Sequence, residues 1–248
     1  MKGLLGLACF GALWEVLPRL GVVPEQWAPP LSRVVRALLV EARERRFWDA
    51  IWDTLVTWAL GLGIAVMAGI VVGVVIGAVP VLRTATASTV EFLRPIPSVA
   101  LIPLAVVLYG VTITSTLVLV VYASFWQVLI QVLHGVADVD PVARDTASIY
   151  RLPKVRYLYW PTALPYIATG VRLAASVALI LAVTGELVIG SPGLGLQISL
   201  AQSGGAVPLM YALVLVTGLI GVAANVVFRL AERKALAWHP SVRREVPA

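Results

Sequence analysis

The chain has 248 residues, of which 60% are hydrophobic and only 13% are charged, with a formal net charge of +6. Soluble domains average about 25% charged residues, so this composition excludes an ordinary soluble domain and indicates a single membrane domain over residues 1–248. No basic stripe with interleaved aromatic residues indicates nucleic-acid binding. The single cysteine, Cys9, and two histidines are too few for a disulfide framework or a metal site, so we expect neither metal nor cofactor.

Three long stretches carry no charged residue, between Asp53 and Arg83, between Arg94 and Asp138, and between Glu186 and Arg229. The hydrocarbon core of a bilayer is about 30 Å thick and takes about 20 residues of helix, so each stretch can cross it. We therefore predict an all-α polytopic membrane protein. About six spans are expected, at residues 3–20, 53–79, 84–108, 114–135, 162–188 and 208–230.

The first span also resembles a signal peptide, because Lys2 precedes an apolar run. No convincing small-residue cleavage site follows, so an uncleaved span is our prediction. Farther along, the sequence Arg-Pro-Ile-Pro at 94–97 interrupts the third span, and Tyr-Gly-Val-Thr at 109–112 is the expected turn before the fourth.

Small residues recur at every fourth position in two spans. Residues four apart share a helix face, and small side chains let helices approach closely in lipid. These ridges predict protein-facing sides, used either for packing within the chain or for a subunit interface or pore wall. The members are Gly61, Ala65, Gly69, Gly73 and Gly77 in the second span, and Gly170, Ala174, Ala178 and Ala182 in the fifth.

Basic residues in the loops predict that both termini and the loop over 136–161 are cytoplasmic. That side receives Lys2, Arg83, Arg144, Arg151, Lys154, Arg156, Arg229, Arg233, Lys234, Arg243 and Arg244, whereas the loops near 109–113 and 189–207 have no Lys or Arg.

Five arginines between the first two spans disagree with this topology. We interpret 32–48 as an amphipathic helix on the membrane surface, in which Glu41 pairs with Arg45 four residues later. The residues expected to face lipid are Val34, Val35, Leu38 and Leu39.

The charged loop over 136–161 is the best indication of function. Asp140-Pro141 is a helix start signal, which predicts a short polar helix from 141 to about 151, ending near Leu152-Pro153. Such a helix on the cytoplasmic side can form a docking surface for another protein. An ordinary solvated loop is the alternative.

Four stretches carry a resemblance to a known family: EFLRPIPSVALIPLAVVLYGV at 91–111, LPYIATGVRLAASVALILAVTGELV at 164–188, SPGLGLQI at 191–198 and AERKALAWHP at 231–240. In their order and spacing, the chain resembles the transmembrane permease subunit of a bacterial ABC importer, in particular the nitrate, taurine and aliphatic sulfonate group. The resemblance covers roughly residues 50–240.

The resemblance implies a type I importer permease fold with its core over 50–234, in a bacterial cell membrane. It implies a pathway for a small anion, a second permease chain in a homodimer, two ABC ATPase subunits and an extracytoplasmic solute-binding protein. The sequence has no Walker-type glycine-rich loop, so we expect ATP hydrolysis in the separate ATPase subunit and no enzyme activity in this chain.

The family's coupling helix, which contacts the ATPase, carries Glu-Ala-Ala, then Gly four positions later and a Leu-Pro pair farther on. The acid is missing at the matching position here, and Asp145 is the nearest substitute. By resemblance, the coupling residues are Val142, Ala143, Arg144, Asp145, Ser148 and Pro161.

Polar residues within the spans are costly in lipid and are functional candidates. We select Ser124, Gln127, Gln131, Arg172 and Glu186 as pathway or gate residues. The alternatives are interhelical hydrogen bonds for the first three, an ion pair of Arg172 with Glu91, and a helix-end bond for Glu186; Arg94 is also three residues from Glu91.

Two other classes of membrane protein compete with this interpretation. An ion-coupled secondary transporter or channel favours inverted repeats with broken helices in both halves, and we see no such repeat. An intramembrane enzyme needs a nucleophile with a base or a metal cluster, and the sequence offers no such set.

Overall fold

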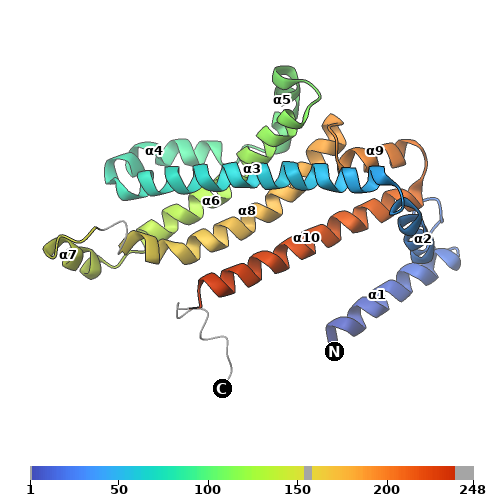
Figure 1. Cartoon of the computed structure of the whole chain (residues 1–248), viewed down its shortest axis with the longest axis horizontal. Helices are drawn as coiled ribbons and strands as arrows, with labels where there is room; N and C mark the ends of the chain where they lie inside the picture. Colours follow the sequence, from blue (N-terminus) through green and yellow to red (C-terminus); the bar gives the residue numbers. More distant parts are fainter. Residues whose placement is uncertain (1, 154–157, 238–248) are drawn as a thin grey trace.

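The structure is a computed structural model that describes residues 2–153 and 158–237 (Figure 1). All regular structure in these ranges is helical, which confirms the predicted fold class. The elements are α1 (Lys2–Arg19), α2 (Leu31–Glu41), α3 (Arg45–Ala78), α4 (Pro80–Leu93), the 3₁₀ helix η1 (Ser98–Leu101), α5 (Ile102–Tyr109), α6 (Ile113–Ala137), α7 (Pro141–Ile149), α8 (Trp160–Ile189), α9 (Leu194–Ser203) and α10 (Val207–Ala235).

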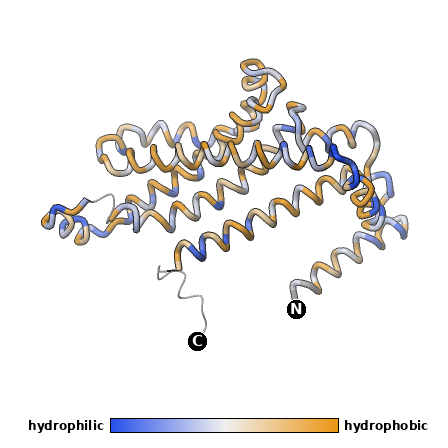
Figure 2. Tube along the Cα trace, in the orientation of Figure 1, coloured by the Kyte–Doolittle hydropathy of each residue, from blue (hydrophilic) through white to orange (hydrophobic). Residues whose placement is uncertain are grey.

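Four of the described helices, α3, α6, α8 and α10, are long and apolar enough to cross a bilayer. A fifth span exists if α4 is counted together with the η1–α5 segment, which is bent from it by 80°. The helix α1 covers the expected first span, but its 18 residues include three charged ones, so it does not join this set. Figure 2 shows hydrophilic segments at α2 and α7, at opposite ends of the apolar helices, as a multi-pass membrane protein requires.

The glycine ridge of α3 packs against valines of α6. Added Cβ atoms at Gly61, Gly69 and Gly73 would lie 2.5–2.9 Å from side-chain atoms of Val120, Val128 and Val132, respectively. Gly77 faces Val136 in the same way, and Ala65 is fully buried. The residue numbers of the paired glycines and valines rise together, so α3 and α6 run parallel. The two helices lie in close contact because the ridge carries no side chain larger than a methyl group.

The ridge of α8 also packs against α6. Gly170 faces Gln131, while Gly135 of α6 faces Ala163, so these two helices run antiparallel. The ridge members Ala174, Ala178 and Ala182 are fully buried. In the most apolar stretch of α6, 50% is buried inside the structure, whereas only 17% of the corresponding stretch of α10 is buried. The helix α6 is therefore central and α10 lies at the periphery.

The predicted surface helix over 32–48 is two elements, because α2 ends at Glu41 and α3 already begins at Arg45. Glu41 pairs with Arg46 through two hydrogen bonds of 2.9 and 3.1 Å, and the predicted partner Arg45 instead lies 3.8 Å from Asp49. The prediction that Val34 faces lipid is also wrong, since α2 packs against α10 and Val34 is fully buried. Leu38 is partly buried against a hydrophobic cluster that includes Phe47 and Leu213, whereas Val35 and Leu39 are exposed.

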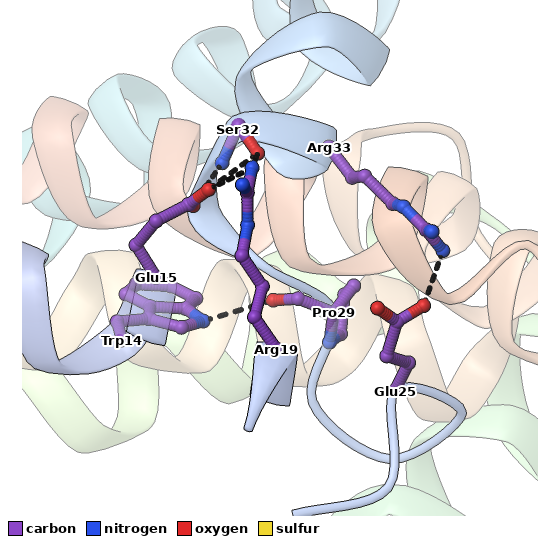
Figure 3. A network of polar contacts seen from close by, with 7 residues as sticks. All are labelled: Trp14, Glu15, Arg19, Glu25, Pro29, Ser32 and Arg33. Atoms are coloured by element: carbon purple, nitrogen blue, oxygen red, sulfur yellow. Dashed lines mark hydrogen bonds and ion pairs between the residues drawn. The ribbon is translucent and has the colours of Figure 1, made fainter. Parts of the chain in front are cut away.

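A polar joint connects α1 to α2 (Figure 3). The Glu15 carboxylate accepts hydrogen bonds from the backbone N–H and the hydroxyl of Ser32, both at 2.9 Å. Trp14 Nε1 donates to the Pro29 carbonyl at 3.1 Å, and Arg33 pairs with Glu25 at 2.6 Å. The carboxyl end of α1 is thus held by hydrogen bonds at the same end of the molecule as α2.

The predicted third span begins at Pro80 rather than 84, and α4 turns back along α3 (Figure 1). Its break at 94–97 is confirmed, because α4 ends at Leu93 and η1 starts at Ser98. The predicted turn at 109–112 is also present, with Gly110 at φ 73°. The segment 189–207, expected as a loop, contains α9, whose buried residues Leu194, Ile198 and Ala201 share one helix face.

Candidate functional site

The helix α7 projects beyond α6 and α8 at one end of the molecule (Figure 1). Asp140 caps it by accepting a hydrogen bond from the Val142 N–H at 2.7 Å, and Pro141 stands in the first turn, where a missing N–H costs nothing. The helix therefore starts where the sequence predicts, and it ends at Ile149, slightly earlier than expected. Residues 154–157 of this loop, with Lys154 and Arg156, lie outside the described residues, as do Arg243 and Arg244.

Most candidate coupling residues are exposed on α7. Val142, Arg144, Asp145 and Ser148 are exposed, Ala143 is half-buried, and Pro161 lies apart, in the first turn of α8. Val142 and Ile149 are seven residues apart and therefore share a face, and their exposed fractions are 72% and 78%. A short helix that presents apolar and charged groups outside the spans has the chemistry of a docking surface.

A second polar site surrounds Glu186, which is fully buried near the end of α8. Its Oε2 accepts hydrogen bonds from the Thr54 hydroxyl at 2.8 Å and from the Gly195 N–H at 3.0 Å. Thr54 in turn accepts from the Leu194 N–H at 2.8 Å. Glu186 and Thr54 together therefore bind the first N–H groups of α9, which need acceptors from outside the helix. This is a helix-end bond, one of the two roles considered from the sequence.

Two glycines of the segment 191–198 permit this arrangement. Gly193 has a φ of 147°, and a Cβ there would overlap the Glu186 carboxyl group. A Cβ at Gly195 would overlap the backbone of α8. Glycine is required at both positions because the start of α9 approaches α8 with no space for a side chain.

The three polar residues of the α6 stripe have different surroundings in the described part of the chain. Ser124 is fully buried and its hydroxyl lies 3.4 Å from the Ala174 carbonyl of α8. The stem of Gln131 packs against Gly170. Gln127 lines a cavity beside the break that follows α4. Gln127 therefore borders this cavity, while Ser124 makes the interhelical contact considered as its alternative.

Arg172 has a different partner from the one predicted. Its Nε lies 3.4 Å from Glu232 of α10, and this atom forms no hydrogen bond among the described residues, so the contact is an ion pair only. Arg172 also lines a cavity of about 620 Å³ between α8 and α10, together with Ser176 and Asn225. The predicted partner Glu91 instead lines a separate cavity with Arg94.

Sequence reasoning missed Thr54 and Glu232, the partners of the two ionisable residues of α8. Thr54 follows Asp53 at the edge of an uncharged stretch, and nothing local distinguishes it from other threonines. Glu232 sits in the basic carboxyl end of α10, where an acid among Arg229, Arg233 and Lys234 is a signal that could have been weighed.

The comparisons with known proteins agree on one family. Residues 65–236 match the family described as the binding-protein-dependent transport system inner membrane component. The chain is 30% identical over 245 residues to the taurine transport system permease protein TauC of Escherichia coli, covering 96% of this chain and 89% of that protein. It is 27% identical over 248 residues to a putative aliphatic sulfonates transport permease protein, SsuC of Bacillus subtilis, covering 97% and 88%. It is 26% identical over 206 residues to the bicarbonate transport system permease protein CmpB of a Synechocystis strain, covering 77% and 73%.

Proposed function

Because the chain belongs to the family of binding-protein-dependent transport system inner membrane components, as the permease subunit of an ABC importer, we propose that it forms the pathway for a small anionic solute. A sulfonate, taurine or nitrate is the proposed class. The names of the relatives, which include taurine, aliphatic sulfonates and bicarbonate, support a small solute with an oxyanion group. The family match covers α6, α7 and α8 completely, and this is the observation that carries the proposal.

The partners are a solute-binding protein outside the membrane, two ABC ATPase subunits and a second copy of this chain. The ridges of α3 and α8 contact α6 within the chain, so the second copy must use other surfaces. In the described part of the chain, α4 has no buried residue and exposes Val81 and Phe92 at 77% and 73%, so its surface is available to a second copy or to lipid.

In the proposed complex, ATP binding by the ATPase subunits drives transport, and α7 is the coupling helix that receives movement from the ATPase. It joins the carboxyl end of α6 to the segment leading into α8. Tyr166 of α8 donates a hydrogen bond to Asp138 at 2.8 Å, just beyond α6, so the two flanks of α7 are linked to each other. A displacement of α7 on ATP binding would then move α6 and α8 together, and the pathway would open to alternate sides.

The proposed topology places both termini and α7 in the cytoplasm, and α2 and α9 outside, in the inner or plasma membrane of a bacterium. It therefore requires α1 to cross the bilayer in spite of its three charged residues. Exclusion of basic residues supports it, since 189–207, which contains α9, has no Lys or Arg. Cysteines introduced at Arg144 and at Gln202, in a Cys9→Ala background, test it. An impermeant thiol reagent added to intact cells should modify only the variant at Gln202, and modification at Arg144 would refute the topology.

The test of coupling is capture of the ATPase by the tagged permease. We expect the pair of substitutions Val142→Asp and Ile149→Asp to leave a folded membrane protein that no longer retains the ATPase, because both side chains lie on the exposed face of α7. Arg43→Glu, beyond the opposite end of the apolar helices, is the matched control and should retain the ATPase at full yield. Normal capture by the α7 variant would show that docking lies elsewhere.

A further inference from the structure

A cavity of about 230 Å³ lies at the break between α4 and η1, against the middle of α6. Its polar lining comes from Arg94 and Ser98 at the break and from Tyr122, Trp126 and Gln127 on α6. All five side chains carry hydrogen-bond donors, and none of the described residues that line the cavity is acidic. The cavity is smaller than the 300–1,000 Å³ typical of drug-sized sites, so it suits a small group.

Arg94 is exposed within this chain and supplies a positive charge that forms no ion pair among the described residues. It is the last charged residue before a stretch without charge that continues to Asp138. The structure of the described ranges contains no ion pair between Arg94 and Glu91, although the two are three residues apart and border the neighbouring cavity together. An arginine within a membrane segment is costly and indicates a functional site unless a structural partner explains it.

Trp126 supplies a buried donor that lacks an acceptor. The residue is 8% exposed, and its Nε1 is buried without a hydrogen-bond partner among the described residues. The indole N–H can only donate, and a buried donor left unpaired destabilises a protein, so a missing ligand is one physical explanation. Tyr122 packs edge-on against Trp126, while its own hydroxyl donates to the Leu93 carbonyl at 2.7 Å and fixes the break against α6.

The position of the cavity along α6 suits a transport site. Residues 122–127 lie about midway along the helix from Ile113 to Ala137, and therefore near the bilayer centre if α6 spans it. The helix pair on the other side is bent by 80° at the same level. Transporters commonly bind substrates near the midplane, where a helix is discontinuous.

We propose that this cavity binds the oxyanion group of the transported solute on its way through the membrane. The inference rests on the proposed function, and it adds a site and named residues to it. Arg94 provides the charge, and the Trp126 N–H, with Ser98 and Gln127, provides hydrogen-bond donors. A sulfonate-sized anion would pair with the Arg94 cation and, once the Trp126 ring turns its covered Nε1 toward the cavity, would accept a hydrogen bond from the indole N–H, because each of its oxygens can accept hydrogen bonds.

Protection of an introduced cysteine tests the site directly. In a Cys9→Ala background, Ala123→Cys places a thiol in the cavity lining without removing a donor. The permease–ATPase complex in phosphatidylcholine nanodiscs is treated with a neutral methanethiosulfonate reagent, with taurine, butanesulfonate, nitrate or bicarbonate added in turn. At least one of these anions should slow modification, while chloride should not. Ala224→Cys, in the cavity between α8 and α10, is the control and should show no protection.

Variants of the proposed ligands then assign the effect. Arg94→Gln and Trp126→Phe should each raise the anion concentration for half protection about tenfold, the effect expected for one lost hydrogen bond to a charged group. Trp126→Phe keeps the aromatic packing, so it stays informative if Arg94→Gln does not fold. Glu91→Gln removes the nearby acid and should lower that concentration.

Three outcomes would overturn the inference. The first is that none of the four anions protects Ala123→Cys, and the second is protection that both ligand variants leave unchanged. The third is protection that appears only when phosphatidylglycerol replaces part of the phosphatidylcholine in the nanodiscs, which would assign the cavity to a lipid headgroup. The complex used must still hold the ATPase and still hydrolyse ATP when the binding protein is added. In such a complex, any of these results would contradict the proposed site without contradicting the proposed function. Failure to retain the ATPase would instead contradict the proposed function.

Discussion

The Thr54 hydroxyl of α3 lies 2.8 Å from the Glu186 carboxylate of α8, across 132 residues of sequence. Both side chains are fully buried. Thr54 uses its hydrogen for Glu186 and its lone pair for the Leu194 N–H of α9. One threonine therefore connects three helices, and the connection sits at the end of the bundle opposite α7.

Replacing Thr54 by valine should destabilise the protein without changing the shape of the side chain. The Leu194 N–H would lose its acceptor and Glu186 one of its donors, which costs about 1–3 kcal/mol for a buried group. Thermal unfolding of the detergent-purified protein measures the loss. Thr54→Ser keeps the hydroxyl and should recover most of the stability. Equal melting temperatures for the two variants would show that the hydroxyl contributes little.

Gly193→Ala should be more damaging than an alanine at an unconstrained glycine. A φ of 147° is disfavoured for any residue with a Cβ, and the added methyl group would overlap the Glu186 carboxyl. Backbone strain alone costs about 1–3 kcal/mol, so a clear fall in melting temperature is expected. Gly218→Ala is the control, because no described atom lies within 4 Å of a Cβ there. If Gly193→Ala melts with the control, the close approach of α9 to α8 is not as described.

The ridge of α3 offers a test of helix packing. Gly69→Ala would place a Cβ 2.8 Å from Val128, and the overpacking should cost about 1–3 kcal/mol. Gly63→Ala, on the same helix with no atom of another helix near its Cβ, should not lower the stability. Adding Val128→Ala to Gly69→Ala should restore part of the stability, because the smaller side chain makes room for the methyl group. Independent effects of the two substitutions would count against direct contact.

The sequence predicts the long helices well because the bilayer imposes their length. The predicted spans at 114–135, 162–188 and 208–230 agree with α6, α8 and α10 to within a few residues, apart from the charged last turn of α10. Local chemistry also predicts the break at 94–97 and the start of α7, since proline and an aspartate cap act on their immediate neighbours. These features depend on the residues that form them and on no distant contact.

The sequence does not predict how the helices pair. The partner of Arg172 is 60 positions away and depends on how α10 crosses α8, which no local pattern encodes. The prediction of one surface helix over 32–48 was wrong for a similar reason. The charged residues at 41–46 are compatible either with one helix or with two helices joined by an ion pair. The helix α9 was not predicted. The segment 189–207 was interpreted only as a loop without Lys or Arg that indicates the external side, although Leu194, Ile198 and Ala201 have helical spacing.

The ion pair between Arg172 and Glu232 should hold α10 against α8. The side chains are 35% and 20% exposed, so the pair is partly desolvated and its loss should cost about 1–2 kcal/mol, between the values for exposed and buried pairs. Arg172→Glu and Glu232→Arg alone each bring like charges together and should lower both the melting temperature and solute uptake by the reconstituted complex. The double variant with the charges exchanged should recover the melting temperature.

Uptake separates a structural role of this pair from a role in the pathway. If the arginine only holds the two helices together, the exchanged pair should restore uptake along with stability, because attraction does not depend on which helix carries the positive charge. If Arg172 contacts the anion in the cavity between α8 and α10, moving the charge to position 232 should restore stability but not uptake. Failure of the exchanged pair to restore even stability would show that the 3.4 Å contact does not hold these helices together.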